Sequence, residues 1–129
     1  MTIKSIIVDD EKHGRENLAG ILKQHCPEIA VVGEANSVEL AILLIQNFQP
    51  ELVFLDIEMP KANGFELLEH FKTIHFEVIF VTAFDNYAIR AIRFSAADYI
   101  LKPINYHDLI AAVTKVSTRI QLKEENERV

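Results

Sequence analysis

Short apolar runs alternate with longer amphipathic segments along the whole chain. The runs are rich in β-branched and aromatic residues, which is typical of strands, and they cover residues 4–8, 30–33, 52–55, 78–81 and 98–101. The third and fourth runs are apolar nearly throughout, as expected of central strands that helices cover on both faces. The pattern predicts an α/β fold in which five strands alternate with helices.

The first two intervening segments have apolar residues at helical spacing and clear ends. Their stripes consist of Leu18, Ile21 and Leu22 in the first, and of Ala41, Leu44, Ile45 and Phe48 in the second. We expect these helices to stop at Pro27 and Pro50, because proline cannot continue a helix. Asn36 or Ser37 can cap the second helix.

Three further helices are predicted in the rest of the chain. The third begins at Asn63-Gly64, and the fifth begins at about Asp108 and keeps its apolar period to Ile120. Their remaining stripes are Leu67, Leu68 and Phe71 in the third, Asp85, Ala88, Ile89 and Ile92 in the fourth, and Leu109, Ala112, Val113 and Val116 in the fifth. The core therefore ends near residue 122, and the polar tail 123–129 is expected to be a solvated helix end or the start of a linker.

Composition indicates one domain and excludes several classes of protein. The chain has 129 residues, half of them hydrophobic, which is enough for one substantial core. Its net charge of -6 argues against direct nucleic-acid binding, which depends on Lys and Arg. Cys26 is the only cysteine, and no apolar stretch is long enough for a signal peptide or a membrane span. We therefore expect a cytoplasmic location.

Polar side chains close four of the five predicted strands. Asp9 and Asp10 follow the first strand, Asp56 the third, Thr82 the fourth and Lys102 the fifth. Taken singly, each has an ordinary interpretation, such as a helix cap, a turn residue, a strand threonine or a surface lysine. Because the carboxyl ends of parallel strands meet at one edge, their joint placement instead predicts a shared site.

This set of groups suits phosphoryl chemistry. Three carboxylates held together repel one another, and Mg²⁺ relieves that repulsion while keeping several water ligands. A carboxylate can also attack a phosphoryl group and form an aspartyl phosphate. Asp56 is the predicted nucleophile because it ends a central strand, while Asp9 and Asp10 suit metal ligation. Lys102 and the Thr82 hydroxyl would stabilise the phosphoryl oxygens.

These residues show a strong resemblance to the receiver domains of two-component response regulators. The motifs that carry it are Val8-Asp9-Asp10, the run from Phe54 to Pro60, Asn63-Gly64, Val81-Thr82-Ala83 and the run from Tyr99 to Pro103. The resemblance implies a flavodoxin-like (β/α)5 three-layer sandwich with parallel strand order 2-1-3-4-5. It also implies a signalling domain that takes a phosphoryl group from a sensor histidine kinase and is not a turnover enzyme.

The resemblance assigns roles to individual residues. The expected metal site consists of Asp9, Asp10, Asp56 and the backbone carbonyl of Glu58. Asp56 would be the phosphoacceptor and Lys102 the phosphoryl-binding lysine, with a cis peptide between Lys102 and Pro103. Thr82 and Tyr99 would be the hydroxyl and the aromatic ring that respond to phosphorylation.

Residues 83–94 and 97–99 are similar to receivers that precede LytTR-type DNA-binding domains. This resemblance implies a transcription regulator whose DNA-binding half is absent from these residues. It further implies phosphorylation-promoted homodimerisation through the fourth helix, fifth strand and fifth helix, where Arg90 and Arg93 would lie near acidic residues.

Three alternatives stay open on the residues. A magnesium-dependent phosphohydrolase would use a similar aspartyl phosphate, but it generally has Asp where this chain has Glu58. A flavodoxin shares the fold, yet the acids after the first strand would repel a flavin phosphate. The third alternative is a receiver-like scaffold that is never phosphorylated, which the complete acceptor set disfavours.

Overall fold

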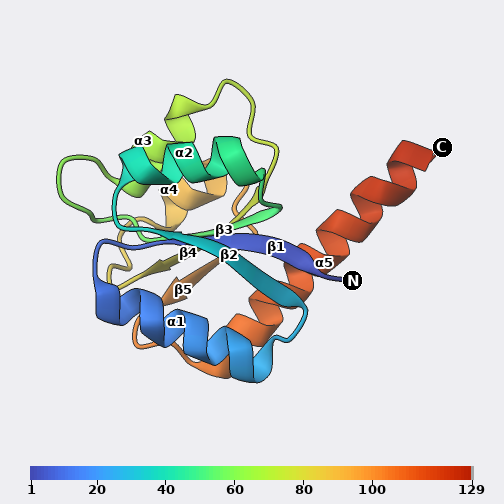
Figure 1. The fold of residues 1–129 in the computed structure, drawn as a ribbon, viewed down its shortest axis with the longest axis horizontal. Helices are drawn as coiled ribbons and strands as arrows, with labels where there is room; N and C mark the ends of the chain where they lie inside the picture. The colour runs from blue at the N-terminus through green and yellow to red at the C-terminus, as the bar shows by residue number, and fades with distance from the viewer. Residues whose placement is uncertain (129) are drawn as a thin grey trace.

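The computed structural model describes residues 1–128, within which five strands alternate with five helices (Figure 1). The strands are β1 (Ile3–Val8), β2 (Ile29–Ala35), β3 (Leu52–Leu55), β4 (Glu77–Thr82) and β5 (Asp98–Leu101). The helices are α1 (Lys12–His25), α2 (Val38–Phe48), α3 (Gly64–His70), α4 (Ala88–Arg93) and α5 (Tyr106–Arg128).

All five strands form one parallel sheet in the order β2-β1-β3-β4-β5, which confirms the predicted topology. The reversal of strand order lies between β1 and β3, which pair directly from Ser5 with Leu52 to Val8 with Leu55. In open α/β sheets, ligands bind beyond the carboxyl ends of the strands at such a reversal. The residues after β1 and β3 are therefore placed where this fold class binds its ligands.

Two hydrophobic layers cover the sheet, and the strand residues divide between them by alternation. Leu52 and Phe54 of β3 pack with α1 and α5, while Val53 and Leu55 pack with α2, α3 and α4. Figure 1 shows the same three-layer arrangement, with α2, α3 and α4 on one face of the sheet and α1 and α5 on the other. Because both faces of β3 are buried, all four of its residues are apolar.

Several predicted boundaries agree with the structure. Helix α1 ends at His25, before Pro27, and α2 ends at Phe48, before Pro50. The cap of α2 is Ser37, whose hydroxyl accepts a hydrogen bond from the Leu40 amide. Asn63 caps α3 in the same way, through the Glu66 amide.

The stripe predicted for the fourth helix was wrong at one residue, because Asp85 lies outside α4, which begins only at Ala88. The face of α4 that carries Ile89 and Ile92 is turned to solvent. The buried residue of α4 is Ala91 instead. Helical spacing identifies residues on one face, but it does not say whether that face is covered.

Smaller differences concern the ends of other elements. Phe71 lies just beyond α3, and β2 continues past the predicted Gly33 to Ala35. Thr82 is the last residue of β4 rather than the residue after it. Helix α5 begins at Tyr106 and continues to Arg128, so residues 123–128 of the polar tail extend the helix with exposed side chains.

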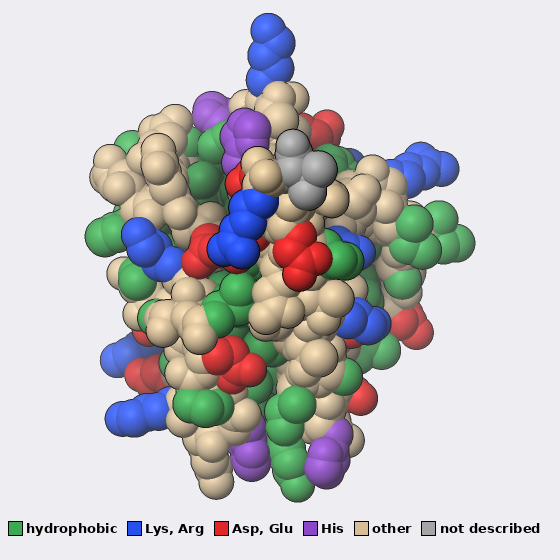
Figure 2. Space-filling model, turned by 90° about the vertical axis from the view of Figure 1, so that its right-hand side faces the viewer, with side chains coloured by type: hydrophobic (Ala, Val, Ile, Leu, Met, Phe, Trp, Pro, Cys, Tyr) green, Lys and Arg blue, Asp and Glu red, His purple; other side chains and the backbone are tan. Residues whose placement is uncertain are grey.

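Figure 2 shows the side of the molecule on which the start of β1 lies, away from the carboxyl ends of the strands. Basic and acidic side chains are interspersed on this face. In residues 1–128, none of the helices is long and apolar enough to cross a membrane.

Candidate phosphoacceptor site

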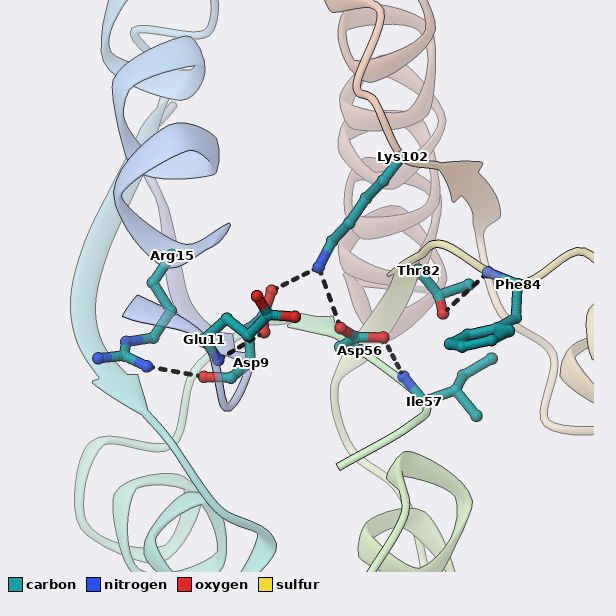
Figure 3. Close-up of polar contacts among 8 residues, drawn as sticks. All are labelled: Asp9, Glu11, Arg15, Asp56, Ile57, Thr82, Phe84 and Lys102. Atoms are coloured by element: carbon teal, nitrogen blue, oxygen red, sulfur yellow. Dashed lines mark hydrogen bonds and ion pairs between the residues drawn. The ribbon is translucent and has the colours of Figure 1, made fainter. Parts of the chain in front are cut away.

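The structure brings the predicted polar residues together at the carboxyl edge of the sheet, and Figure 3 shows four of them, Asp9, Asp56, Thr82 and Lys102. Asp9 and Asp10 follow β1, Asp56 follows β3, Thr82 ends β4 and Lys102 follows β5. Strands β1, β3, β4 and β5 are consecutive in the sheet, so these side chains are neighbours in space. The arrangement is the one expected from the sequence.

Asp9, Asp10 and Asp56 form a compact acidic cluster. One carboxylate oxygen from each residue lies within 4.8 Å of the others. Asp9 and Asp56 are buried, with 5% and 7% of their surface exposed, while Asp10 is half-buried. Charges at this separation and burial interact strongly, so the cluster requires cations nearby.

Lys102 supplies one cation to this cluster. Its Nζ lies 2.7 Å from Asp9 Oδ2 and 3.0 Å from Asp56 Oδ2, bridging the two buried carboxylates. Burial alone would lower the pKa of Lys102, but hydrogen bonds and charge from Asp9 and Asp56 outweigh it and raise the pKa. Three carboxylates and one ammonium leave two negative charges, which a divalent cation would balance.

The Asp56 carboxylate is held from both sides. Its Oδ1 accepts a 2.7 Å hydrogen bond from the Ile57 amide, and its Oδ2 contacts Lys102. Burial raises the pKa of Asp56, the bond and charge of Lys102 oppose that rise, and the charge of Asp9 adds to it. The carboxyl group is therefore fixed in orientation, while the contacts with Lys102 do not fully offset the cost of burying its negative charge. Such a perturbed carboxylate is typical of functional sites.

Thr82 and Tyr99 both contact the loop between β4 and α4. The buried Thr82 hydroxyl accepts a 3.4 Å hydrogen bond from the Phe84 amide. The hydroxyl of the half-buried Tyr99 donates to the carbonyl of the same residue, Phe84. A movement of the Thr82 hydroxyl would thus act on a residue that Tyr99 also binds.

Glu58 lies in the exposed loop two residues after Asp56. Its side chain points to the β4–α4 loop, where its Oε2 accepts a 3.1 Å hydrogen bond from the Tyr87 hydroxyl. The proposed role of its backbone carbonyl in metal binding stays a prediction. The peptide between Lys102 and Pro103 is cis.

Two glycines shape the site, and the role of one was not foreseen. A Cβ atom on Gly14 would lie 2.5 Å from Asp9 Oδ2 and 3.4 Å from Lys102 Nζ. A Cβ atom on Gly64 would lie 2.5 Å from the Asp56 carbonyl oxygen. Gly64 belongs to a recognised motif, whereas the signal for Gly14 was a glycine inside a helix, four residues after Asp10, where glycine costs about 1 kcal/mol relative to alanine.

Comparison with known proteins identifies the family. The model of the response regulator receiver domain matches residues 6–114. The chain belongs to the response regulator receiver family. This result confirms the family predicted from the sequence, and the cluster of Asp9, Asp10 and Asp56 is the acidic triad typical of receiver metal sites.

Individual relatives of this receiver domain agree with that assignment. The chain is 48% identical over 104 residues to the transcriptional regulatory protein BtsR of Salmonella typhimurium, covering 79% of this chain and 43% of BtsR. It is 39% identical over 115 residues to the sensory transduction protein LytT of Enterococcus faecalis, covering 87% of this chain and 47% of LytT. The receiver domain therefore spans about half the length of these relatives.

A solved receiver structure matches nearly the whole chain. The REC domain of AraT, a response regulator from Geobacillus stearothermophilus, superposes with a TM-score of 0.85 at 30% identity. The match covers 96% of this chain and 99% of the AraT domain. The fold of this chain is therefore that of a receiver domain.

Proposed function

We propose that this receiver domain is a cytoplasmic signalling switch in which a sensor histidine kinase phosphorylates Asp56 in a Mg²⁺-dependent reaction. The observation that carries the proposal is the contact of Lys102 Nζ with Asp56 at 3.0 Å, inside a cluster of three carboxylates. One acceptor carboxylate, one fixed cation and two further acids are the groups that phosphoryl transfer requires.

The chain's own residues account for most of the transfer step. An oxygen of Asp56 forms a bond to phosphorus while the bond from phosphorus to the kinase histidine nitrogen breaks, and that nitrogen keeps the electron pair. Lys102 lies beside Asp56 and would neutralise charge on the transferring oxygens. The Thr82 hydroxyl would turn from Phe84 to donate a hydrogen bond to one of these oxygens.

The donor set of the acidic cluster fits Mg²⁺. Carboxylates are ligands that this ion prefers, and it usually keeps several waters instead of a full protein shell. Asp9, Asp10 and Asp56 would hold the ion, with the Glu58 carbonyl as a further ligand. When bound, Mg²⁺ would neutralise charge on the phosphoryl oxygens.

Incubation with acetyl phosphate and Mg²⁺, followed by intact mass measurement, tests the proposal. We expect a single phosphoryl adduct on the wild-type protein and none on Asp56→Asn. An adduct of equal yield on the variant would refute the assignment of Asp56. In a parallel assay with p-nitrophenyl phosphate, sustained turnover would favour the phosphohydrolase alternative, whereas the switch predicts none.

The proposed output face consists of α4, β5 and α5. Several apolar side chains on it are exposed, including Ile89 at 75%, Ile92 at 73% and Leu101 at 46%. Exposed apolar groups that lie together mark interaction surfaces. We propose that phosphorylation promotes homodimerisation through this face, with the Thr82, Phe84 and Tyr99 contacts linking it to the acceptor.

Arg90, which the sequence placed near acidic residues of this face, pairs instead with an acid outside it. Arg90 pairs with Glu69 of α3 at 3.4 Å, and its guanidinium lies 4.3 Å from the centre of the Phe65 ring. It therefore joins α4 to α3 within one molecule. The apolar residues Ile89 and Ile92 replace it as the basis for the dimer proposal.

We further propose that the natural protein is a transcription regulator with a LytTR-type DNA-binding domain after this receiver. Support comes from the similarity of residues 83–94 and 97–99 to such receivers and from the relative BtsR, which is a transcriptional regulatory protein of about twice this length. In this proposal the receiver itself does not touch DNA.

Sedimentation with and without beryllofluoride, an acyl-phosphate mimic, tests the proposed dimer, and equal sedimentation would contradict it.

A further inference from the structure

Arg15 in the first turns of α1 makes contacts that the proposed phosphoryl chemistry does not use. Its side chain is only 17% exposed, although arginine side chains are mostly exposed on protein surfaces. Its Nη1 donates a 2.9 Å hydrogen bond to the backbone carbonyl of Asp9, and its Nε lies 3.4 Å from Glu34 Oε1 on β2 (Figure 3 shows the bond to Asp9). The guanidinium therefore joins α1, the β1–α1 loop and β2.

The carbonyl that Arg15 binds belongs to the peptide that joins Asp9 to Asp10. A peptide unit is planar, so fixing its oxygen also fixes the direction in which the Asp10 nitrogen and Cα leave Asp9. The other side of Asp9 is already held, because its amide donates a 3.0 Å hydrogen bond to the Ala35 carbonyl. Together these two contacts fix the backbone that carries both acids.

The side chain of Asp9 is positioned separately. Its Oδ1 accepts a 2.9 Å hydrogen bond from the Glu11 amide, and its Oδ2 contacts Lys102. None of the hydrogen bonds in the described part of the chain is accepted by the Asp10 carboxylate. The position of Asp10 in the acidic cluster thus depends on its backbone, and Arg15 is the side chain that holds this backbone.

We propose that Arg15 is a positioning residue for the metal site, which orients the Asp9–Asp10 peptide so that both carboxylates face Asp56. This inference rests on the proposed function, because it presumes that the acidic cluster binds Mg²⁺. It makes a prediction opposite to that of simple electrostatics. A positive charge near the site repels Mg²⁺, so removing the charge alone would tighten binding, whereas losing the orientation of a metal ligand weakens it.

Calorimetric titration of Mg²⁺ into the unphosphorylated protein separates the two effects. We expect Arg15→Ala to raise the dissociation constant about tenfold, as does the loss of other groups that orient metal ligands. The conservative variant Arg15→Lys should give an intermediate value, because an ammonium can reach the Asp9 carbonyl but lacks the fork that also reaches Glu34. A dissociation constant in Arg15→Ala equal to or below that of the wild type would overturn the proposal.

Lys12→Ala is the matched control for charge. Lys12 lies on the same helix, is 80% exposed and, among the charged groups of residues 1–128, pairs with Glu16 alone, at 3.8 Å. We expect its removal to leave Mg²⁺ binding unchanged or slightly tighter. If Arg15→Ala does not fold, the Mg²⁺ titration of Arg15→Lys tests the proposal. A dissociation constant above that of the wild type supports the proposal, and a wild-type value refutes it.

The wild-type titration distinguishes failure of this inference from failure of the proposed function. If the wild-type protein binds no Mg²⁺, the magnesium part of the proposed function is wrong. If the wild type binds and Arg15→Ala binds equally well, only the role of Arg15 is wrong. Urea unfolding of each variant completes the set, since a purely structural role would lower stability without changing the Mg²⁺ affinity of the folded protein.

Discussion

The acceptor pocket and the α4–β5 face differ in how completely their side chains are held. In the pocket, Asp9, Asp56 and Thr82 are buried, and each makes at least one hydrogen bond. On the α4–β5 face, Ile89 and Ile92 are exposed, and α4 is a six-residue helix with one fully buried residue, Ala91. The proposed chemistry and the proposed output are thus placed on regions of very different packing.

This difference suits a switch. A transfer site must hold its groups near the reacting geometry before substrate arrives. An element that changes arrangement must instead be held by few buried contacts, since regions of low local stability are the ones that move. Phe84 lies between the two regions, because Thr82 accepts from its amide and Tyr99 donates to its carbonyl.

Removal of the Lys102 ammonium from the acceptor pocket should have the largest effect on stability. Lys102→Ala should lower the free energy of unfolding in metal-free buffer by about 2 kcal/mol, in the range for hydrogen bonds to charged groups. Mg²⁺ should restore more stability to this variant than to the wild type, because the ion supplies the missing positive charge. Lys115→Ala is the control: Lys115 also pairs at 3.0 Å, with Asp98, but is largely exposed, so its loss should cost less than about 1 kcal/mol. Equal losses in urea unfolding would contradict the comparison.

A smaller effect is expected from two glycines of α1. Within residues 1–128, no atom outside the adjacent helix backbone lies within 4 Å of a Cβ atom at Gly20, so Gly20→Ala should stabilise the protein by about 0.5–1 kcal/mol. At Gly14 the added methyl group would collide with Asp9 Oδ2, and Gly14→Ala should therefore bring no gain or a net loss in urea unfolding. Equal stabilisation by both changes would show that the Asp9 carboxylate leaves room for a methyl group at position 14.

The charge of Asp56 should appear as a pH dependence of stability. Burial raises the pKa of Asp56 above its ordinary value of 3.8, so the folded protein holds this proton more tightly than the unfolded chain does. The contribution of Asp56 to stability is therefore full below pH 3.8 and is lost as the pH rises through the folded pKa. In metal-free buffer, the stability of Asp56→Asn relative to the wild type should increase with pH over this window. Urea unfolding at several pH values measures this difference in the free energy of unfolding. If the difference stays constant or falls as the pH rises, burial does not outweigh Lys102 in setting the pKa of Asp56.

The smallest effect on stability is expected on the output face. Ile89→Ser should change the free energy of unfolding by no more than about 0.5 kcal/mol, because the side chain is exposed. It should nevertheless weaken the beryllofluoride-dependent dimer in sedimentation. Leu43→Ser on α2, which removes a comparably exposed apolar side chain, should leave the dimer intact. Wild-type dimerisation of Ile89→Ser would remove α4 from the proposed interface.

Much of the fold and the site could be predicted because the signals were local in sequence. Strand β3 could be predicted from four consecutive apolar residues, and Asp56 follows it directly. Parallel pairing then converts position along each strand into proximity at one edge. The shared edge of a parallel sheet predicted that Asp9, Asp56 and Lys102 gather in one site, and the resemblance to receiver domains supplied the strand order.

What could not be predicted depends on contacts between distant residues. The same apolar spacing marks the covered face of α2 and the exposed face of α4, and only packing separates them. The part played by Gly14 depends on where the Asp9 carboxylate and the Lys102 ammonium come to rest. Arg90 was expected near acidic residues of the face made by α4, β5 and α5, yet it lies against Glu69 and Phe65 of α3.

Chemical mapping of the phosphorylated residue tests the central claim most directly. Borohydride reduces an aspartyl phosphate to homoserine, so protein treated with acetyl phosphate and Mg²⁺ can be reduced, digested and sequenced by tandem mass spectrometry. The account predicts homoserine at position 56 and unmodified aspartate at positions 9 and 10. Homoserine at position 9 or 10, with Asp56 unmodified, would contradict it.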